Sequence, residues 1–400
     1  MANAEADRRF AEGVAFHRQG LLAQAAQSYA LACAADPANV AARFNLAVAL
    51  HGEGRHLDAE AAYKRALVLK PDLVPALNNL ANLYLEHNRI AEALEILMRA
   101  TKAAPDFAPP WNNLGNALLR MGRTEEARAH FEGALKRDPE FVEARINLGK
   151  CLQSLGRPRE ALPHLEWALA RDPRDASLRF LRDAVAGARP AKPPDAFVAK
   201  LFDDMSAQFD EHLVERLGYR IPGRIADVLG PWLDARARPR CVLDLGCGTG
   251  LVADALRGRF EQMHGVDLSP RMAERARSRK LYSTVAVGDL LAFLAAQPAQ
   301  CADLVSAADV FIYVGDLGAV FAEVARVLAP AGRFAFSIEG GGAGEGFGLE
   351  PTGRYVHAGG YIGALAQSSR LESICATSEI LRAEIGRPVI GRLIVLARGA

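Results

Sequence analysis

The sequence predicts a two-domain protein, in which an all-helical solenoid of repeats precedes an α/β domain with a mostly parallel, seven-stranded sheet. Three observations support this. Proline recurs every 34 residues in the first half. In the second half, short apolar runs alternate with helical patterns. The chain has 400 residues, half of them apolar, which is enough for two cores. We expect repeats and a capping helix over residues 1–188, a linker over 189–196, and the α/β domain over 197–400, beginning with a lid helix.

The first half contains five repeat units over residues 6–175. Alanines stand five and twelve residues before each proline, where small side chains let two helices pack closely, and a large apolar residue lies between them. A Gly or Asn marks the turn inside each unit. The prolines are Pro37, Pro71, Pro105, Pro139 and Pro173. This pattern resembles the tetratricopeptide repeat, and an apolar helix over 176–188 is expected to cover the end of the last unit.

Asparagine also recurs at the repeat period, on the first helix of each unit, which lines the concave face of such arrays. The ladder and its neighbours are Asn45, Asn79, Asn113 and Asn147, with Asn82 and Asn116. Amides pair with both the N–H and the C=O of an extended peptide. The ladder is similar to the asparagine-lined superhelix of O-GlcNAc transferase, which holds protein substrates. We expect a protein or peptide partner on the concave face, with helix packing and local hydrogen bonding as the structural alternative.

A glycine turn is the most informative feature of the second half. An apolar strand ends on Asp244, and a helix is expected near Leu251. The turn between them is Gly246, Cys247, Gly248, Thr249 and Gly250. Glycines allow a ligand to approach the backbone, and the helix start aims unpaired N–H groups at the same place. A dinucleotide-binding turn has its third glycine one residue later, and Asp244 would repel phosphates. The turn therefore favours a cationic, nucleotide-like ligand.

Further strands are expected to follow this turn. Asp267 ends the second strand, at the position from which a carboxylate accepts hydrogen bonds from two ribose hydroxyls, and Leu268 would pack on the adenine. Acids after successive strands line one crevice of an α/β sheet, although each acid alone is equally consistent with a helix cap. The expected strands cover 263–267, 284–287, 303–308 and 334–338, with two antiparallel runs around 374–381 and 389–397.

The glycine turn resembles motif I of the class I S-adenosylmethionine-dependent methyltransferases. This resemblance implies S-adenosyl-L-methionine as the cofactor, adenine contacts at Asp289 and Leu290, and the methionine part along Ala308. The segment 201–222 resembles the N-terminal helix of a bacterial group of methyltransferases that carry tetratricopeptide repeats. There Phe209 and Arg220 are candidates for covering the cofactor, while Met205 stands where that group has tyrosine.

Methyl transfer needs chiefly alignment and the exclusion of water, with a general base only for a protonated nucleophile. If a base is used, we expect it in the loops after the fourth and fifth strands. His357 is favoured because its ordinary pKa suits neutral pH, with Asp309 and Tyr313 as further candidates. A surface histidine without a role is the alternative. The glycine-rich stretch 340–348 is expected to form a mobile loop over the substrate mouth.

Composition restricts the remaining possibilities. The chain has 48 basic and 47 acidic residues without blocks of like charge, which disfavours nucleic-acid partners. It contains neither a signal segment nor 18 uninterrupted apolar residues, so that a cytoplasmic protein without membrane partners is expected. The six cysteines form no C-x-x-C pair, and no metal site is indicated. The oligomeric state is not predicted.

Together these features predict S-adenosylmethionine-dependent methyl transfer onto a protein or peptide acceptor recruited by the repeats. One alternative is a small-molecule O- or N-methyltransferase whose repeats dock a partner or another copy of the chain. The other is a non-enzymatic assembly factor that has lost its chemistry, against which the acids Asp244, Asp267 and Asp289 argue.

Overall fold

The structure is a computed structural model, and it describes residues 2–206, 209–210, 213, 217–235, 239–340, 346–350, 352–384 and 387–399. The chain forms two compact units, Met1–Ala168 and Leu169–Ala400. Each unit is described by itself below.

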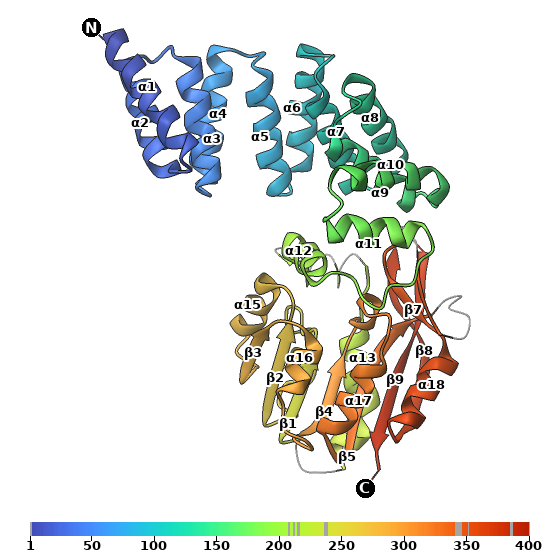
Figure 1. The fold of residues 1–400 in the computed structure, drawn as a ribbon. Helices are drawn as coiled ribbons and strands as arrows, with labels where there is room; N and C mark the ends of the chain where they lie inside the picture. The colour runs from blue at the N-terminus through green and yellow to red at the C-terminus, as the bar shows by residue number, and fades with distance from the viewer. Residues whose placement is uncertain are drawn as a thin grey trace. The chain divides into compact units, whose positions relative to one another are not determined.

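The first unit is a row of helix pairs, coloured blue to green in Figure 1. The helices are α1 (Ala2–Arg18), α2 (Leu22–Ala35), α3 (Val40–Gly52), α4 (His56–Leu69), α5 (Val74–Glu86), α6 (Ile90–Ala103), α7 (Ala108–Arg120), α8 (Thr124–Arg137), α9 (Val142–Ser154) and α10 (Pro158–Arg171), the end of α10 belonging to the second unit. Each pair corresponds to one repeat, as the 34-residue period predicts.

The repeat residues have the packing roles that their sizes suggest. The recurring alanines are buried between helices, as are the large residues between them, among which Tyr29, Tyr63 and Phe131 are at most 1% exposed. Where glycine faces such a residue, the fit leaves no room for a methyl group: a Cβ on Gly115 would lie 2.5 Å from the Phe131 ring. The turn residues all have positive φ: Gly20, Gly54, Asn88, Gly122 and Gly156. These left-handed turns favour glycine and asparagine, because the Cβ atom of most other residues is sterically strained at positive φ.

The second unit is a three-layer α/β structure. Its helices are α11 (Ala176–Val185), α12 (Asp195–Met205), α13 (Ile221–Asp234), α14 (Leu251–Ala255), α15 (Pro270–Ser278), α16 (Leu290–Ala295), η3 (Phe311–Tyr313), α17 (Gly318–Val327) and α18 (Gly359–Ser368). Its strands are β1 (Cys241–Leu245), β2 (Gln262–Asp267), β3 (Thr284–Val287), β4 (Ala302–Ala307), β5 (Leu328–Glu339), β6 (Phe347–Leu349), β7 (Tyr355–His357), β8 (Leu371–Glu384) and β9 (Arg387–Arg398). Each expected strand is present, and β6 and β7 add a separate hairpin.

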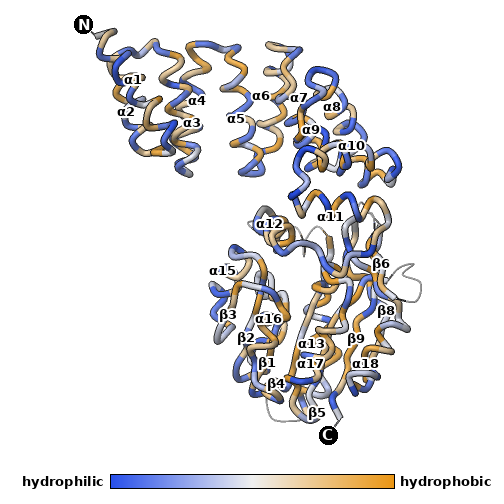
Figure 2. Tube along the Cα trace, in the orientation of Figure 1, coloured by the Kyte–Doolittle hydropathy of each residue, from blue (hydrophilic) through white to orange (hydrophobic). Residues whose placement is uncertain are grey.

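The seven-stranded sheet has the strand order β3-β2-β1-β4-β5-β9-β8, which can be followed in Figure 1. Strands β1 to β5 pair in parallel, and β9 pairs antiparallel with β5 and β8. Neighbouring residues on β1 face opposite cores: Val242 packs with α13 and α14, and Leu243 with α16 and α17. Both faces of the sheet are covered, and the inner strands β1 and β4 are accordingly buried and mostly apolar (Figure 2). The parallel strands therefore present their carboxyl ends at one edge of the sheet.

The expected capping helix is α11, and it belongs to the second unit, as does the linker. Phe180 on α11 packs against Phe197 and Tyr355. The linker is fastened to the α/β core, since the Tyr355 hydroxyl donates to the Pro190 carbonyl at 2.8 Å and Gly315 N donates to the Ala191 carbonyl at 2.8 Å. In the part of the chain described, no helix is long and apolar enough to cross a bilayer.

Candidate cofactor site

The glycine turn joins β1 to α14 through three residues with positive φ, Gly246 (58°), Gly248 (54°) and Gly250 (92°). At Gly246 a Cβ would lie 2.7 Å from the Val310 side chain, so the close approach of the two loops itself requires glycine. Gly250 caps α14, whose first residue is Leu251. Cys247 between the glycines is buried, and its N–H donates to the Val266 carbonyl at 2.9 Å, which fastens the turn to the end of β2.

Asp244 lies beneath the turn, and only 1% of its surface is exposed. Its carboxylate accepts hydrogen bonds from the Ser306 and Tyr282 hydroxyls, each at 2.7 Å. Burial nevertheless raises the pKa of Asp244 to about 6, because two neutral donors compensate only part of the lost hydration. A buried acid of this kind gains stability from a cationic ligand nearby and repels an anionic one.

Asp267 ends β2 and holds the next loop in place. Its two oxygens accept from Gly248 N and Ser269 N, both at 2.8 Å. It is 9% exposed, and burial raises its pKa. A carboxylate offers about four lone-pair positions, so that both oxygens retain capacity for ligand hydroxyls. Leu268, half-buried, follows directly beside it.

Asp289 stands in a different environment from the other two acids. Its Oδ1 caps α16 by accepting from Leu291 N (2.9 Å) and Ala292 N (3.1 Å), and its Oδ2 pairs with Lys192 of the linker at 3.0 Å. Although partial burial opposes ionisation, Lys192 and the helix amides lower the pKa of Asp289. Leu290 is half-buried at the first position of α16. An adenine amine would therefore have to share this carboxylate with a lysine.

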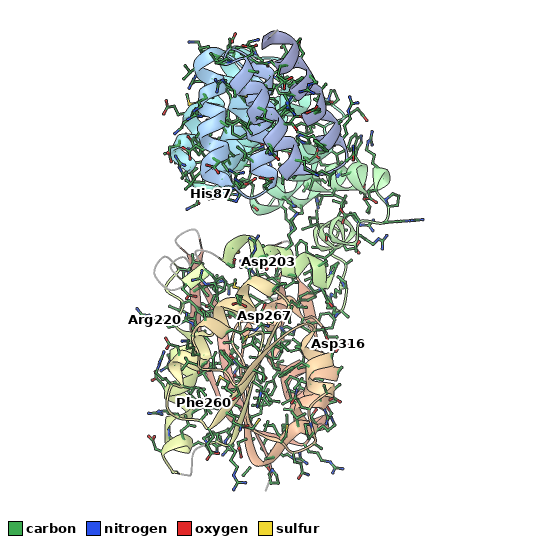
Figure 3. The ribbon with its side chains drawn as sticks, turned by 90° about the vertical axis from the view of Figure 1, so that its left-hand side faces the viewer. His87, Asp203, Arg220, Phe260, Asp267 and Asp316 are labelled. Carbon is green, nitrogen blue, oxygen red and sulfur yellow. The ribbon has the colours of Figure 1, made fainter. Side chains whose placement is uncertain are left out.

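The lid helix α12 brings further acids to the strand ends. Asp203 accepts from the Ser269 hydroxyl at 2.5 Å and from Arg271 N at 3.2 Å, and thus joins α12 to the start of α15. Figure 3 shows Asp203 lying above Asp267. Beyond α12, Asp210 accepts from the Thr249 hydroxyl in the glycine turn and pairs with Arg279 at 2.5 Å. Asp203 and Asp210 lie in the segment 201–222 that resembles the N-terminal helix of related methyltransferases. Nothing in the sequence indicates which atoms these two carboxylates reach.

The lid also contributes aromatic side chains. The Phe209 ring lies 3.9 Å from where a Cβ on Gly248 would be. Phe202 contacts both Phe209 and Tyr313, with ring centroids 6.0 Å and 5.2 Å apart. Arg220, by contrast, is exposed at the start of α13. The structure thus brings Phe209 to the turn and Tyr313 to Phe202, and leaves Arg220 at the surface. Lid residues 207–208, 211–212 and 214–216 lie outside the described part.

The loop after β4 carries a buried ion-pair network. Ala308 is half-buried, and Asp309 adopts the left-handed region with φ 57°. Arg382 on β8, 3% exposed, donates to Asp309 at 2.9 Å and to Glu339 at 2.8 Å. Burial raises the pKa of Asp309, with partial compensation from Arg382. Held by this arginine, Asp309 is better placed to orient the loop than to accept a proton.

The expectation that His357 acts as a base is not supported by its position. The ring is 2% exposed, and its Nε2 lies 3.0 Å from the carbonyl oxygens of both Val314 and Gly315, where it must be the donor. Burial lowers its pKa, and Nδ1 is buried without a hydrogen-bond partner among the described residues. A surface location is also wrong, because β7 places the ring inside the core. Of the glycine-rich loop, residues 341–345 lie outside the described part.

In the repeat unit, two asparagines of the ladder already donate hydrogen bonds to other asparagines. Asn113 donates to Asn78 at 2.8 Å, and Asn147 donates to Asn112 at 2.9 Å. These bonds join neighbouring repeats, which is the structural role that the sequence left open. The six predicted ladder residues are all half-buried: Asn45, Asn79, Asn82, Asn113, Asn116 and Asn147.

Family models match both halves of the chain. A family model described as a methyltransferase domain matches residues 243–336. Tetratricopeptide-repeat models match residues 10–74, 50–117 and 118–182. Among curated relatives, human methyltransferase-like protein 27 is 38% identical over 22% of this chain and 35% of its own length. The malonyl-[acyl-carrier protein] O-methyltransferase of Halorhodospira halophila is 32% identical over 36% of this chain and 48% of its own length. The chain thus spans half or less of these relatives.

Among solved structures, a thermophilic tetratricopeptide-repeat protein of Thermus thermophilus has a TM-score of 0.39 and 23% identity, covering 45% of this chain and 98% of its own. The repeat matches lie on α1 to α11, and the methyltransferase match contains the glycine turn and the strand ends described above. The chain therefore combines tetratricopeptide repeats with a methyltransferase domain of the class I fold.

Proposed function

We propose that the chain transfers a methyl group from S-adenosylmethionine to a protein or peptide acceptor that the repeat array recruits. The observation that carries the cofactor assignment is the pair of buried acids, Asp244 and Asp267, around a turn of left-handed glycines. A buried carboxylate with a raised pKa accommodates a sulfonium and ammonium ligand better than a pyrophosphate.

The residues present fit this cofactor. Asp267 would hold the ribose with the lone pairs that Gly248 and Ser269 leave free. Leu268, Asp289 and Leu290 would border the adenine. When bound, S-adenosylmethionine supplies a methyl group already activated on a sulfonium. The chain's own contribution is to orient the acceptor and exclude water, for which Phe209, Phe202 and Tyr313 form an apolar cover.

The acceptor class rests on the repeats. Amides on the ladder are half-buried, and Asn79 and Asn82 line a pocket together with His51. Backbone groups of an extended peptide suit such amides. A small-molecule acceptor is the second candidate, because Asn113 and Asn147 already bond to neighbouring repeats and because a ubiquinone biosynthesis O-methyltransferase of Thiobacillus denitrificans is 34% identical over 26% of this chain.

Two measurements test the proposal. Calorimetric titration of the full chain should show one site for S-adenosylmethionine and for its demethylated product, and tight binding of a nicotinamide or flavin nucleotide instead would refute the cofactor assignment. Isotopically labelled methyl donor, supplied with cellular protein and metabolite fractions, then reports the acceptor.

The acceptor experiment has three distinguishable outcomes. Protein-bound label that falls in the Asn79→Ala, Asn113→Ala, Asn147→Ala triple variant supports recruitment by the ladder. Label confined to metabolites and unchanged in the triple variant favours the small-molecule reaction. Stoichiometric cofactor binding without turnover in any fraction leaves an assembly factor. Asp267→Ala serves as the variant that should lose label in either of the first two outcomes.

A further inference from the structure

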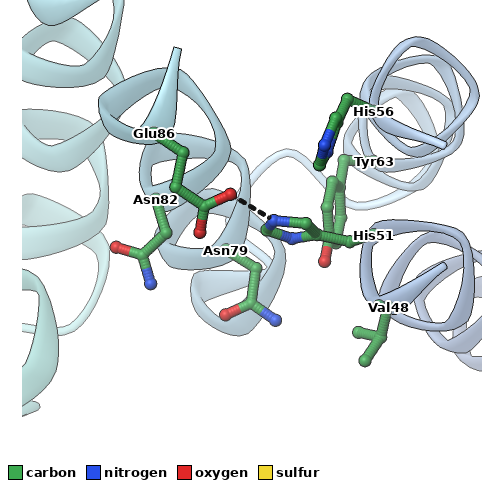
Figure 4. A pocket seen from close by; sticks show the side chains of 8 residues that line it. Val48, His51, His56, Tyr63, Asn79, Asn82 and Glu86 are labelled. Atoms are coloured by element: carbon green, nitrogen blue, oxygen red, sulfur yellow. Dashed lines mark hydrogen bonds and ion pairs between the residues drawn. The ribbon is translucent and has the colours of Figure 1, made fainter. Parts of the chain in front are cut away.

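One junction of the repeat array gathers three metal-ligating side chains. His51 lies in the last turn of α3, His56 begins α4, and Glu86 ends α5. One ligand atom from each lies within 4.8 Å of the other two. Figure 4 shows the three side chains converging, with the His51–Glu86 bond drawn as a dashed line of 2.8 Å. The loops and helices of two successive repeats thus bring two imidazoles and one carboxylate to a single point.

The repeat pattern shows that packing alone does not require these residues. One repeat earlier, the positions of His51, His56 and Glu86 are occupied by His17, Leu22 and Gly52. One repeat later they are occupied by Leu85, Ile90 and Arg120. Helix packing at this position is therefore compatible with apolar residues, and the complete trio occurs at one junction of the array.

The electrostatics of the cluster suit a cation. The Glu86 carboxylate lies 2.8 Å from the Nε2 atom of His51. Among the ion pairs described, Glu86 has no lysine or arginine partner that would occupy it. The carboxylate is thus not committed to a basic side chain among these ion pairs.

Two polar atoms at the same place are left unsatisfied. The Nδ1 atom of His56 is buried and has no hydrogen-bond partner among the described residues. The Tyr63 hydroxyl is likewise buried without a hydrogen-bond partner in the part of the chain that the structure describes. Buried polar atoms in native proteins are nearly always paired, so such orphans point to a missing ligand.

These groups border a pocket of about 470 Å³, lined also by Val48, Asn79 and Asn82. We propose that His51, His56 and Glu86 bind one divalent transition-metal ion of the kind that imidazole and carboxylate ligands favour, with Zn²⁺ as the best probe. Metal–ligand distances of about 2.0–2.2 Å require only side-chain rotations from the present spread. The fourth position faces the pocket and Tyr63, where water or a donor atom of a bound partner completes the coordination.

The sequence carries no local signature of this cluster, because it is not built from closely spaced cysteines and histidines. The ligands come from three helices and two repeats, and a spacing of five and then thirty residues matches no local metal motif. His87 lies behind His56, with ring centroids 4.5 Å apart, and is held by its own bond to the Leu83 carbonyl at 2.8 Å. It therefore supports the orientation of His56 without belonging to the trio.

The test uses the untagged full chain and Zn²⁺ alone. Equilibrium dialysis should give one bound Zn²⁺ per chain, and Co²⁺ in its place should produce the absorption bands of a low-symmetry site. The variant combining His51→Leu, His56→Ile and Glu86→Gln should lose this site while folding, because Leu85 and Ile90 already occupy the first two positions in the next repeat. Single changes of either histidine should weaken Zn²⁺ binding at least tenfold, since even outer partners of metal ligands cost about that much.

The matched control is His17→Leu, which removes the repeat equivalent of His51. His17 contacts Tyr29 edge-on just as His51 contacts Tyr63, with ring centroids 6.1 Å and 6.4 Å apart. This control should bind Zn²⁺ like the unaltered chain. The proposal is overturned if the triple variant retains the bound Zn²⁺, which would place the ion elsewhere in the chain, if His17→Leu lowers binding equally, or if no stoichiometric Zn²⁺ is held at all. In the last case His51 and Glu86 form only an ion pair.

Discussion

The two units satisfy their polar residues in opposite ways. In the repeat unit, Asn113 and Asn147 bond to the equivalent helix one repeat away, so that partners lie 35 residues apart at each step. In the methyltransferase unit, Asp203 bonds across 66 residues to Ser269, and Arg382 across 73 residues to Asp309. The repeat array is therefore a chain of similar local contacts, whereas the strand-end site is assembled from distant segments.

This difference separates polar residues that hold a fold together from those that await a ligand. Asn113 and Asn147, which donate to asparagines of the preceding repeat, stabilise the array whether or not a partner binds. The acids Asp244 and Asp267 are buried with raised pKa values, which costs stability in the absence of a cation. Polar groups that are paired within the fold thus have a structural role, and the unfavourable burial of an acid indicates function.

The largest expected effect is that of Asp267→Ala on the cofactor. Removing a buried carboxylate that binds two hydroxyls should weaken S-adenosylmethionine binding by about 2–3 kcal/mol. Asp289→Ala should cost less, about 1 kcal/mol, because that carboxylate is already shared with Lys192 and with the helix amides. Calorimetric titration measures both. Equal losses for the two acids, or none for Asp267→Ala, would remove the distinction between them.

The next effect concerns the packing of the array. Gly115→Ala should lower the free energy of unfolding by about 1–3 kcal/mol, because the added methyl would meet the Phe131 ring. Phe131→Leu should reduce the cost of Gly115→Ala when the two are combined, which a double-mutant cycle in urea measures. Cofactor affinity should be unchanged in all three variants. A loss of affinity would show that the two units are energetically coupled.

A smaller effect is the pH dependence of cofactor binding. The pKa of Asp244 is raised to about 6, above its usual 3.8, so the folded chain takes up a proton more readily than the unfolded one. This contribution to stability is present at low pH and is lost as the pH rises through 6. Binding of a cation favours the ionised form, so affinity should fall about tenfold between pH 7 and pH 5. Asp244→Asn should remove this dependence of cofactor affinity on pH. If the affinity of the unaltered chain did not change with pH, the role of Asp244 beside a cationic ligand would be contradicted.

The smallest effect is that of one rung of the ladder. Asn147→Ala removes one inter-repeat hydrogen bond and should destabilise the array by about 0.5–1.5 kcal/mol. Urea denaturation followed by circular dichroism measures this. If Asn147→Ala left stability unchanged yet reduced methylation of a protein acceptor, the ladder would bind the acceptor and would not mainly stabilise the array. The polar residues of the two units would then not differ in role.

Much of the fold follows from local patterns. The left-handed turns at Gly20, Gly54 and Asn88 and the buried alanines of each repeat were expected from the spacing alone, because helices with a small-residue face have few ways to pack. The strand ends at Asp244 and Asp267 were likewise expected, since glycine turns and apolar runs have local signatures.

Several site residues could not be predicted in this way. Nothing in the linker sequence indicates that Lys192 reaches Asp289, and a histidine on a short strand does not reveal whether it faces a pocket or the core. The ordinary pKa of histidine favours His357 as a base, whereas its burial against two carbonyl oxygens, which lowers that pKa, does not support the role.

The amino-acid sequence by itself determined the 34-residue period, the succession of strands and the glycine turn, because each is a property of neighbouring residues and their preferred backbone angles. Only the tertiary structure decided that Asp203 meets Ser269 and Asp210 meets the glycine turn, that Arg382 holds Asp309, and that His51, His56 and Glu86 meet. These convergences depend on how distant segments pack, and side-chain periodicity records which face of an element is buried but not what it meets there.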